Sequence, residues 1–164
     1  MPLPADNAGT TACKLTTAVE SFIKTLDELK PLFELHYDML ALDQDRVPLD
    51  PQYDVYAAHE AAGELSFVAL RADGALVGYW VSFVCPALHY AGCKTAQMDM
   101  WFIHPGHAGG TAPLRLIRAV EAELRRRSVQ RWSATEKLHT PCGRLFEAVG
   151  MEKVEATYAK WIGD

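Results

Sequence analysis

Long apolar runs and paired cysteines are both missing from this 164-residue sequence. No apolar run approaches the ~20 residues that a membrane-spanning helix needs, and residues 1–11 lack the basic-then-apolar order of a signal peptide. The cysteines are Cys13, Cys85, Cys93 and Cys142. Because no two of them form a Cys-x-x-Cys pair, neither a zinc site nor a dense disulfide framework is indicated. We therefore expect a cytoplasmic protein with reduced thiols, no bound metal and no membrane partner.

A stripe of basic and aromatic residues, which nucleic-acid binding would favour, is also missing, so we expect no nucleic-acid partner. The net charge is −5, and it is unevenly distributed: residues 1–82 hold 13 Asp and Glu against 5 Lys and Arg, whereas residues 83–164 hold 8 against 11. The acidic excess is densest at Asp38, Asp43, Asp45, Asp50 and Asp54. This pattern favours an anionic ligand beside the second half and a cationic one near the first.

The composition is that of an ordinary globular protein, with 49% hydrophobic and 23% charged residues. The length suits one domain with a sizeable core. Prolines, a glycine and small polar residues near the start predict a flexible tail over residues 1–13, followed by a single domain at 14–164.

Two helices are predicted in the first half of the chain. Thr25-Leu26-Asp27-Glu28 has the form of a capping box, and apolar residues continue at helical spacing to Leu42. Pro31 lies inside this segment and is expected to kink or divide the helix. The second helix should begin at Asp50-Pro51, with Asp50 as the N-cap, and stop at Gly63.

Six segments have strand patterns, with apolar and β-branched residues between turn signals. They are residues 14–23, 65–71, 75–84, 95–103, 130–135 and 151–162, the last being one strand or a pair. Asp73-Gly74 predicts a hairpin between the second and third strands, and residues 86–94 are expected to form a loop. A helix lies between 95–103 and 130–135, so these two strands should run parallel. A short helix is expected over residues 140–149.

A glycine-rich turn between a strand and a helix predicts phosphate binding. Residues 107–112 follow the strand at 95–103, and Pro113 opens the helix. The apolar stripe of that helix is Leu114, Ile117, Val120 and Leu124. Gly109 and Gly110 have no β-carbon, so their amides can approach an oxyanion closely, and the helix presents unpaired N–H groups and the positive end of its dipole. The alternative interpretation is a turn that only connects two elements.

Three stretches together resemble the GCN5-related N-acetyltransferases, the GNAT family. They are Trp101–Pro105 at the end of the central strand, the turn His107–Ala112, and Arg144–Met151 late in the chain. The resemblance covers residues 14–162 and is most specific over 95–151. It implies an α/β fold of the α+β type, in which about four helices flank a mixed, centrally splayed sheet of about six to seven strands.

Within the family, the chain looks closest to small acetyltransferase-like proteins of bacteriophages. This finer resemblance comes from Leu35-His36-Tyr37 and from the segment Ala156–Lys160.

The resemblance also implies acetyl-CoA as the co-substrate. Its diphosphate would bind the amides of the turn, and its pantetheine arm would pair with the backbone at the end of the central strand. The implied contacts are Trp101, Phe102, Ile103, His107, Ala108, Gly109, Gly110, Thr111, Ala112 and Cys142. The family's turn has the form Arg/Gln-x-x-Gly-x-Gly/Ala. Gly110 and Ala112 match it, whereas His107 replaces Arg or Gln, which points to a modest cofactor affinity.

Phe146 stands where family members commonly have a tyrosine that protonates the departing thiolate. A phenyl ring cannot donate a proton. The candidates for the general acid are therefore Tyr158, Cys142, His139 and solvent. Together with His107, this departure favours an alternative function: a catalytically weak or inactive GNAT-fold binding module.

The general base is expected to be Asp99, with Glu136 as the second candidate. Asp99 lies on the central strand, where a carboxylate is costly to bury without a purpose or a partner. Transfer to an amine requires a base, because the amine must lose a proton before it attacks the thioester. The alternative interpretation of Asp99 is a structural residue bonded to backbone or to an arginine.

The leading hypothesis is direct transfer of an acyl group from acetyl-CoA to a primary amine, without a metal or a covalent enzyme intermediate. The acceptor is a small-molecule or protein amine, and the acidic excess suggests that it is cationic. A homodimer is left open.

A rival hypothesis is dinucleotide binding, because Gly106, Gly109 and Gly110 partly imitate the Rossmann pattern and Glu136 follows on the next strand. Against it, only 28 residues follow Glu136, too few for the further strand and helix units of that fold.

Overall fold

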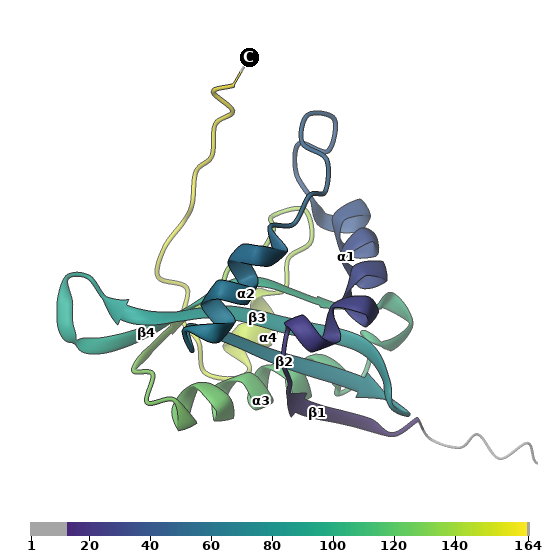
Figure 1. Ribbon diagram of the computed structural model, residues 1–164, viewed down its shortest axis with the longest axis horizontal. Coiled ribbons are helices and arrows are strands. Elements are labelled where there is room, and N and C mark those ends of the chain that lie inside the picture. The colour runs from purple at the N-terminus through teal and green to yellow at the C-terminus, as the bar shows by residue number, and fades with distance from the viewer. Residues whose placement is uncertain (1–12, 164) are drawn as a thin grey trace, which may run out of the picture.

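A single sheet of five strands forms the centre of the described part of the protein. The computed structural model describes residues 13–163, so most of the tail predicted at 1–13 lies outside the described residues. In spatial order the strands are β1 (Leu15–Val19), β2 (Leu65–Ala72), β3 (Ala75–Ala87), β4 (Tyr90–Ile103) and β5 (Arg131–Ser133). The first four are antiparallel neighbours (Figure 1). β5 runs parallel to β4, as predicted from the helix that connects them.

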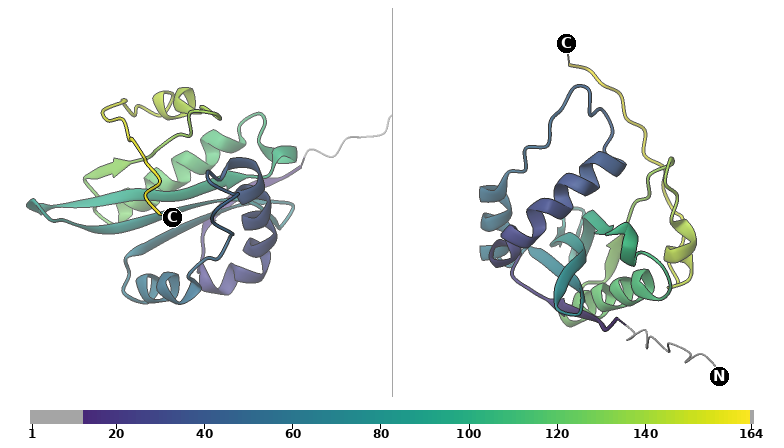
Figure 2. Two further views of the ribbon diagram at one scale, coloured as in Figure 1. Left: turned by 90° about the horizontal axis from the view of Figure 1, so that it is seen from above. Right: turned by 90° about the vertical axis from the view of Figure 1, so that its right-hand side faces the viewer.

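Helices cover both faces of the sheet, with α1 and α2 on one face and α3 and α4 on the other (Figure 2). Their bounds are α1 (Leu26–Leu40), α2 (Tyr53–Ala61), α3 (Ala112–Arg126) and α4 (Gly143–Glu147), and short 3₁₀ helices span Ile23–Thr25 and Pro105–His107. The predicted α+β fold with about four helices is therefore confirmed.

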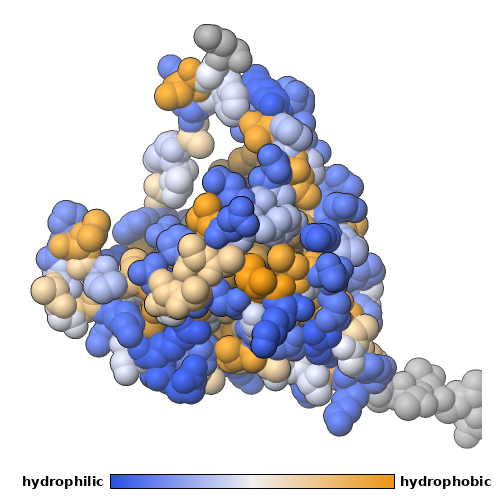
Figure 3. All heavy atoms as spheres, in the orientation of Figure 1, coloured by the Kyte–Doolittle hydropathy of each residue, from blue (hydrophilic) through white to orange (hydrophobic). Residues whose placement is uncertain are grey.

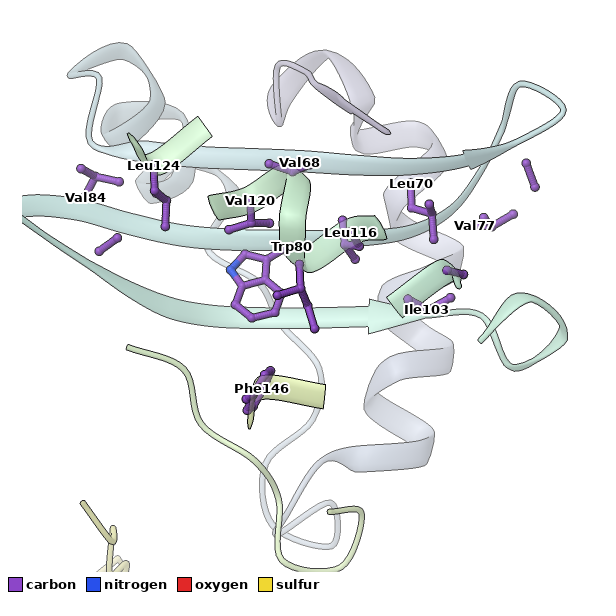
Figure 4. Close-up of a cluster of buried hydrophobic side chains, with 14 residues drawn as sticks. Val68, Leu70, Val77, Trp80, Val84, Ile103, Leu116, Val120, Leu124 and Phe146 are labelled. Carbon is purple, nitrogen blue, oxygen red and sulfur yellow. The ribbon is translucent and has the colours of Figure 1, made fainter. Parts of the chain in front are cut away.

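Two hydrophobic cores lie on opposite faces of the sheet, because neighbouring residues of a strand point to opposite sides. Trp80 on β3 packs under α3 and α4 with Leu116, Val120 and Phe146 (Figure 4). Its neighbour Tyr79 packs on the other face, under α1 and α2. The other members of that second core are Phe22, Leu29, Leu32, Phe33, Leu65, Phe67, Ala69, Val81 and Phe102.

The prediction of six to seven strands is wrong, since the sheet has five. The missing strand or strand pair is the one expected at 151–162. That segment is extended and leaves the body of the molecule (Figure 1), and its backbone makes no ladder with any strand of the described chain. Its composition suits a strand, but a strand forms only where a neighbouring edge supplies hydrogen bonds.

Several element boundaries also differ from those predicted. Pro31 is accommodated inside one uninterrupted α1, and α2 begins at Tyr53, after the predicted Asp50-Pro51 start. The capping box is not formed, because Thr25 Oγ1 donates to the carbonyl of Ser21 at 2.8 Å. The predicted loop at 86–94 is mostly strand: β3 and β4 continue to a tight hairpin.

Among residues 13–163, no helix combines the length and the apolar character that crossing a membrane would require.

Candidate functional site

The central strand β4 pairs with β3 along one edge, but its pairing with β5 along the other edge ends at Gln97. Among residues 13–163, β5 pairs with β4 only through Thr95–Gln97, so residues 98–103 have no strand partner there on the edge that faces away from β3. The two parallel strands therefore separate beyond Gln97, and the backbone edge of β4 is left open. This opening is the splay that the resemblance implied for the end of the central strand.

A β-bulge lies at the start of this open edge. Val81 of β3 pairs with Met100, whereas the next residue, Ser82, pairs with Met98. Asp99 is the extra residue between them. Because of the bulge, Met98 packs with the core under α3 while Met100 packs with the core under α1 and α2. Bulges re-aim side chains, and this one turns Asp99 toward α2.

The turn after β4 leaves several amides unpaired. The N–H groups of Gly109, Gly110 and Thr111 donate to no residue among 13–163. Gly110 adopts a positive φ of 60°, which favours glycine, and a β-carbon at Gly109 or Gly110 would meet no atom within 4 Å. The amides therefore border open space. They precede the 15-residue helix α3, whose N-terminal dipole favours an anion at this position.

Two histidines lie beside the turn. The rings of His104 and His107 are 5.9 Å apart, and Nδ1 of His104 accepts a hydrogen bond from the Gly106 amide at 3.1 Å. His107 makes no such bond with the part of the chain that the structure describes, so its ring nitrogens are available beside the unpaired amides. Arg115 adds positive charge one turn further along α3, where its Nε donates to Thr111 Oγ1 at 3.2 Å.

In the described part of the chain, the Asp99 side chain has one hydrogen-bonding partner, and it comes from α2. The hydroxyl of Tyr56 donates to Asp99 Oδ2 at 2.6 Å. Burial, the hydrogen bond and the charge of Asp99 all raise the pKa of Tyr56 well above its ordinary value, so its phenol stays protonated and remains a donor. The carboxylate itself is exposed. Asp99 therefore keeps an oxygen open to solvent, as a residue that receives a proton from a substrate must.

A second polar pair, His36 and Tyr79, lies on the face of the sheet that α1 and α2 cover. Nδ1 of His36 on α1 is 2.7 Å from the hydroxyl of Tyr79, and the imidazole stacks on Phe102 with ring centroids 4.9 Å apart. Burial, and to a lesser extent the charge of Lys137, lower the pKa of His36 to about 4. The imidazole is thus neutral at pH 7 and accepts the proton of the Tyr79 hydroxyl, which fixes the position of Phe102 on the open edge.

Glu136 and Cys142 lie together at the start of α4. Glu136 Oε2 accepts hydrogen bonds from the amides of Cys142 at 2.8 Å and Gly143 at 2.6 Å. Both oxygens of Glu136 approach the position that a β-carbon of Gly143 would occupy, at 3.1 Å. The carboxylate thus caps the helix. Burial and the nearby Glu136 charge raise the pKa of the Cys142 thiol to about 11, so it carries a proton at neutral pH.

Phe146 is buried on the inner face of α4. Its ring centroid lies 6.1 Å from that of Trp80, and Figure 4 shows these two side chains. The ring centroid of Trp101, on the open edge of β4, lies 6.0 Å from that of Phe146. At the position where family members commonly have a tyrosine, the site thus has a buried phenyl ring among aromatic side chains. Tyr158 does not supply the missing hydroxyl, because its side chain is 94% exposed on the extended C-terminal segment. His139 is also exposed, in the turn before α4.

Three of the predicted groups are therefore brought together: the turn at 107–112, the edge at 101–103, and Asp99 on the bulge. α4 adjoins this edge through Phe146 and brings Glu136 and Cys142 with it. The sequence did not predict that Tyr56 and the His36–Tyr79 pair would lie at the site. The apolar spacing of α1 and α2 showed that these helices pack on the sheet, but not which polar side chains of theirs meet β4.

The fold and the site together define an α+β protein in which the open edge of β4 leads into a turn with unpaired amides among residues 13–163. Residues 27–151 match the sequence profile of the acetyltransferase (GNAT) family, and the chain belongs to this family. No curated protein sequence matches the chain significantly.

Solved structures show the same fold. The ribosomal-protein-alanine N-acetyltransferase of Brucella melitensis biovar Abortus 2308 is 20% identical, with a TM-score of 0.69, over 92% of this chain and all of that one. An aminoglycoside acetyltransferase from an uncultured soil metagenomic sample is 11% identical, with a TM-score of 0.70, over 92% and 99% of the two chains. AAC(6')-Iy in complex with a CoA bisubstrate analogue is 16% identical, with a TM-score of 0.63, over 92% and 99%.

Proposed function

We propose that the protein is an acetyl-CoA-dependent N-acetyltransferase that moves an acyl group directly to a primary amine. The single observation that carries the proposal is the open edge of β4 at residues 98–103, which runs into a turn with three unpaired amides at the start of α3. A coenzyme with a diphosphate at one end and an amide-containing arm at the other is complementary to both features.

The chain's own residues supply the chemistry as follows. The unpaired amides at 109–111 bind the diphosphate, and backbone N–H groups on the open edge of β4 orient the arm and polarise the thioester carbonyl. Asp99 accepts the proton that the attacking amine loses, and Tyr56 holds the carboxylate in place. As the C–N bond forms and the C–S bond breaks, the Cys142 thiol or solvent returns a proton to the leaving sulfur.

The acceptor is proposed to be a cationic amine. Asp38, Asp43, Asp45, Asp50 and Asp54 belong to α1, to α2 and to the loop between them, on the side of the sheet toward which Asp99 turns. Two of the solved structures are named as aminoglycoside acetyltransferases, which supports an amine acceptor of this kind. The finer resemblance to small phage acetyltransferases and the cytoplasmic location remain predictions that accompany this proposal.

The proposal is tested by calorimetric titration with acetyl-CoA, followed by incubation with a panel of mono- and polyamines. Products should be detected by mass, as the acetylated amine and free CoA, because the exposed Cys13 and Cys85 would react with thiol reagents. Saturable binding with acetylation of at least one amine is the expected result. Absence of acetyl-CoA binding would refute the proposal.

A second candidate function is a binding module without transfer activity. Phe146, buried against Trp80 and Trp101, favours it because the position offers no acid. Saturable cofactor binding without turnover of any amine in the panel is the result that this second function predicts.

A further inference from the structure

The first strand of the sheet, β1, has a free outer edge. Among residues 13–163 it pairs only with β2. The Glu20 amide donates to the carbonyl of Phe67 in β2 at 3.2 Å, so the even-numbered residues of β1 direct their N–H and C=O groups toward β2. Because these groups alternate along a strand, those of Thr17 and Val19 point outward, where they bond to no residue of the described chain. Such an edge is a template for an added strand.

A groove runs between this edge and α3, which packs beside β1. Leu15 packs with the core under α3, so Thr17 and Val19, which follow at every second position, face α3 as well. Opposite them α3 presents Ala119 and Ala122, whose short side chains leave the groove open. Val19 is 49% exposed there. Figure 3 shows apolar and hydrophilic surface side by side along the lower edge of the molecule, where Figure 1 places β1. We call this feature, lined by Thr17, Val19, Ala119 and Ala122, the β1 groove.

Arginines of α3 border the β1 groove. Arg118 lines it and makes no ion pair or hydrogen bond with any described residue. Arg115 closes one end, because its Nη1 donates to the carbonyl of Leu15 at 3.3 Å, and Arg126 lies at the other end. Among the described residues, the acidic one that lines the groove is Glu123, which is 4% exposed and already paired with Arg126. The groove is thus positively charged in a protein whose net charge is −5.

We propose that the β1 groove binds an extended, acidic segment of a partner protein, which joins the sheet as a further strand beside β1. Backbone groups of the segment bond to those of Thr17 and Val19, its apolar side chains contact the floor of the groove, and its carboxylates pair with Arg118. β1 spans about 17 Å, so a segment of about five or six residues covers it. Backbone pairing requires an extended ligand, and the arginines favour an acidic one.

A second copy of this chain fits the β1 groove less well. Antiparallel pairing of two β1 strands about a two-fold axis puts both α3 helices on the same face of the joined sheet. The Arg118 side chains of the two copies then approach each other, and like charges oppose the contact. The charge of the groove therefore selects an acidic partner over a second copy.

The test is fluorescence anisotropy of a labelled peptide that repeats Val-Glu-Glu over about nine residues, titrated with the full chain at low salt. We expect saturable binding of this peptide and none of its Val-Lys-Lys counterpart. Hydrogen exchange should show that the bound peptide protects the amides of Thr17 and Val19. Equal binding of both peptides, or no binding of the acidic one, would overturn the proposal.

A pair of variants separates the groove from the charge of the whole protein. Arg118→Glu should weaken binding of the acidic peptide about ten-fold or more, because it reverses the charge beside the groove. Arg125→Glu is the matched control: it makes the same change on the same helix, outside the groove, at a residue paired with Glu121. It should leave the affinity unchanged. Equal losses for the two variants would mean that net charge alone attracts the peptide, contrary to the proposal.

A second pair of variants tests the backbone pairing. Thr17→Pro removes an outward N–H group and no bond to β2, so β1 should still form. It should weaken peptide binding about ten-fold, whereas Thr17→Ala should retain it. Undiminished binding by a folded Thr17→Pro variant, verified by circular dichroism, would refute a strand added to β1. Light scattering that gave a wild-type dimer and a Thr17→Pro monomer would assign the edge to a second copy and would equally refute the proposal.

Discussion

The hydroxyl of Tyr56 lies 2.6 Å from Asp99 Oδ2, and this hydrogen bond joins α2 to the bulge of β4. The bulge turns Asp99 out of the regular alternation of the strand, and the hydrogen bond from Tyr56 holds it there. The arrangement gives the carboxylate a partner on the stretch 98–103, where the other residues are apolar. It also makes the catalytic assignment testable with isosteric substitutions.

We predict that Asp99→Asn lowers kcat by about 100-fold or more, because removal of a general base costs roughly 10² to 10⁴ in rate. The dissociation constant for acetyl-CoA should stay within about two-fold, since the turn and the edge amides are untouched. Tyr56→Phe should have a smaller effect on kcat, because the carboxylate remains but loses its orienting bond. An Asp99→Asn variant with wild-type kcat would eliminate Asp99 as the base.

Gly110→Ala should weaken acetyl-CoA binding by about ten-fold. Its φ of 60° is strained for any residue with a β-carbon by roughly 1–2 kcal/mol, and relief of that strain would rotate the amides of the turn. Gly74→Ala is the matched control, because Gly74 has a φ of 91° in the β2–β3 hairpin and open space around its β-carbon position. Calorimetry should show weaker binding for the first variant only; equal affinities for both would mean that the turn does not hold the coenzyme.

His107→Arg should tighten acetyl-CoA binding several-fold, since a permanent positive charge beside the unpaired amides attracts a diphosphate. The gain should shrink as salt is added. His89→Arg, on the β3–β4 hairpin far along the chain from the turn, adds the same charge and should leave the affinity unchanged. If His89→Arg gave an equal gain, the effect would come from net charge and not from the site.

The His36–Tyr79 pair should make the protein less stable in acid. The pKa of His36 is about 4 in the folded protein and near 6.5 when unfolded, so the unfolded chain binds more protons between these values. This contribution to stability is full above about pH 6.5 and is lost as the pH falls toward 4. From pH 6.5 to 5 the loss is about 2 kcal/mol.

His36→Asn removes the titration and keeps an acceptor for the Tyr79 hydroxyl. Urea unfolding at several pH values should show that the free energy of unfolding of the variant falls less steeply below pH 6.5 than that of the wild type. Parallel curves for the two proteins would contradict a buried, neutral His36.

Two substitutions of Glu136 distinguish its role as a helix cap from a role as the general base. Glu136→Ala should lower the free energy of unfolding by about 1–2 kcal/mol, because the amides of Cys142 and Gly143 lose their acceptor. Glu136→Gln keeps an acceptor oxygen and should keep both stability and kcat. A large fall in kcat for the Gln variant, with folding intact, would instead favour Glu136 as the base.

Local patterns predicted the part of the site that lies within one continuous stretch. The strand at 95–103, the turn at 107–112 and the helix opened by Pro113 are adjacent in the chain, and glycine and proline mark their ends. Here sequence order and spatial order agree, so the position of the glycine-rich turn between β4 and α3 could be predicted from residues alone.

Contacts between distant elements could not be predicted in the same way. Tyr56 and Asp99 are 43 residues apart, as are His36 and Tyr79, and nothing in the spacing of either helix indicates which strand residue it meets. The bulge at Asp99 depends on the register with β3, which a single strand does not encode. The error in strand number has the same origin: residues 151–162 have a strand's composition, but composition does not supply a neighbouring edge.

The most direct test of the central claim is a titration of the ¹⁵N-labelled protein with acetyl-CoA, in which NMR monitors the amide resonances of the protein. The coenzyme should shift the amides of residues 107–112 and 101–103 most, in one saturable process, with smaller changes at Asp99 and little change along β1 and β2. Saturable shifts elsewhere, with the turn and the β4 edge unaffected, would contradict the proposed coenzyme site.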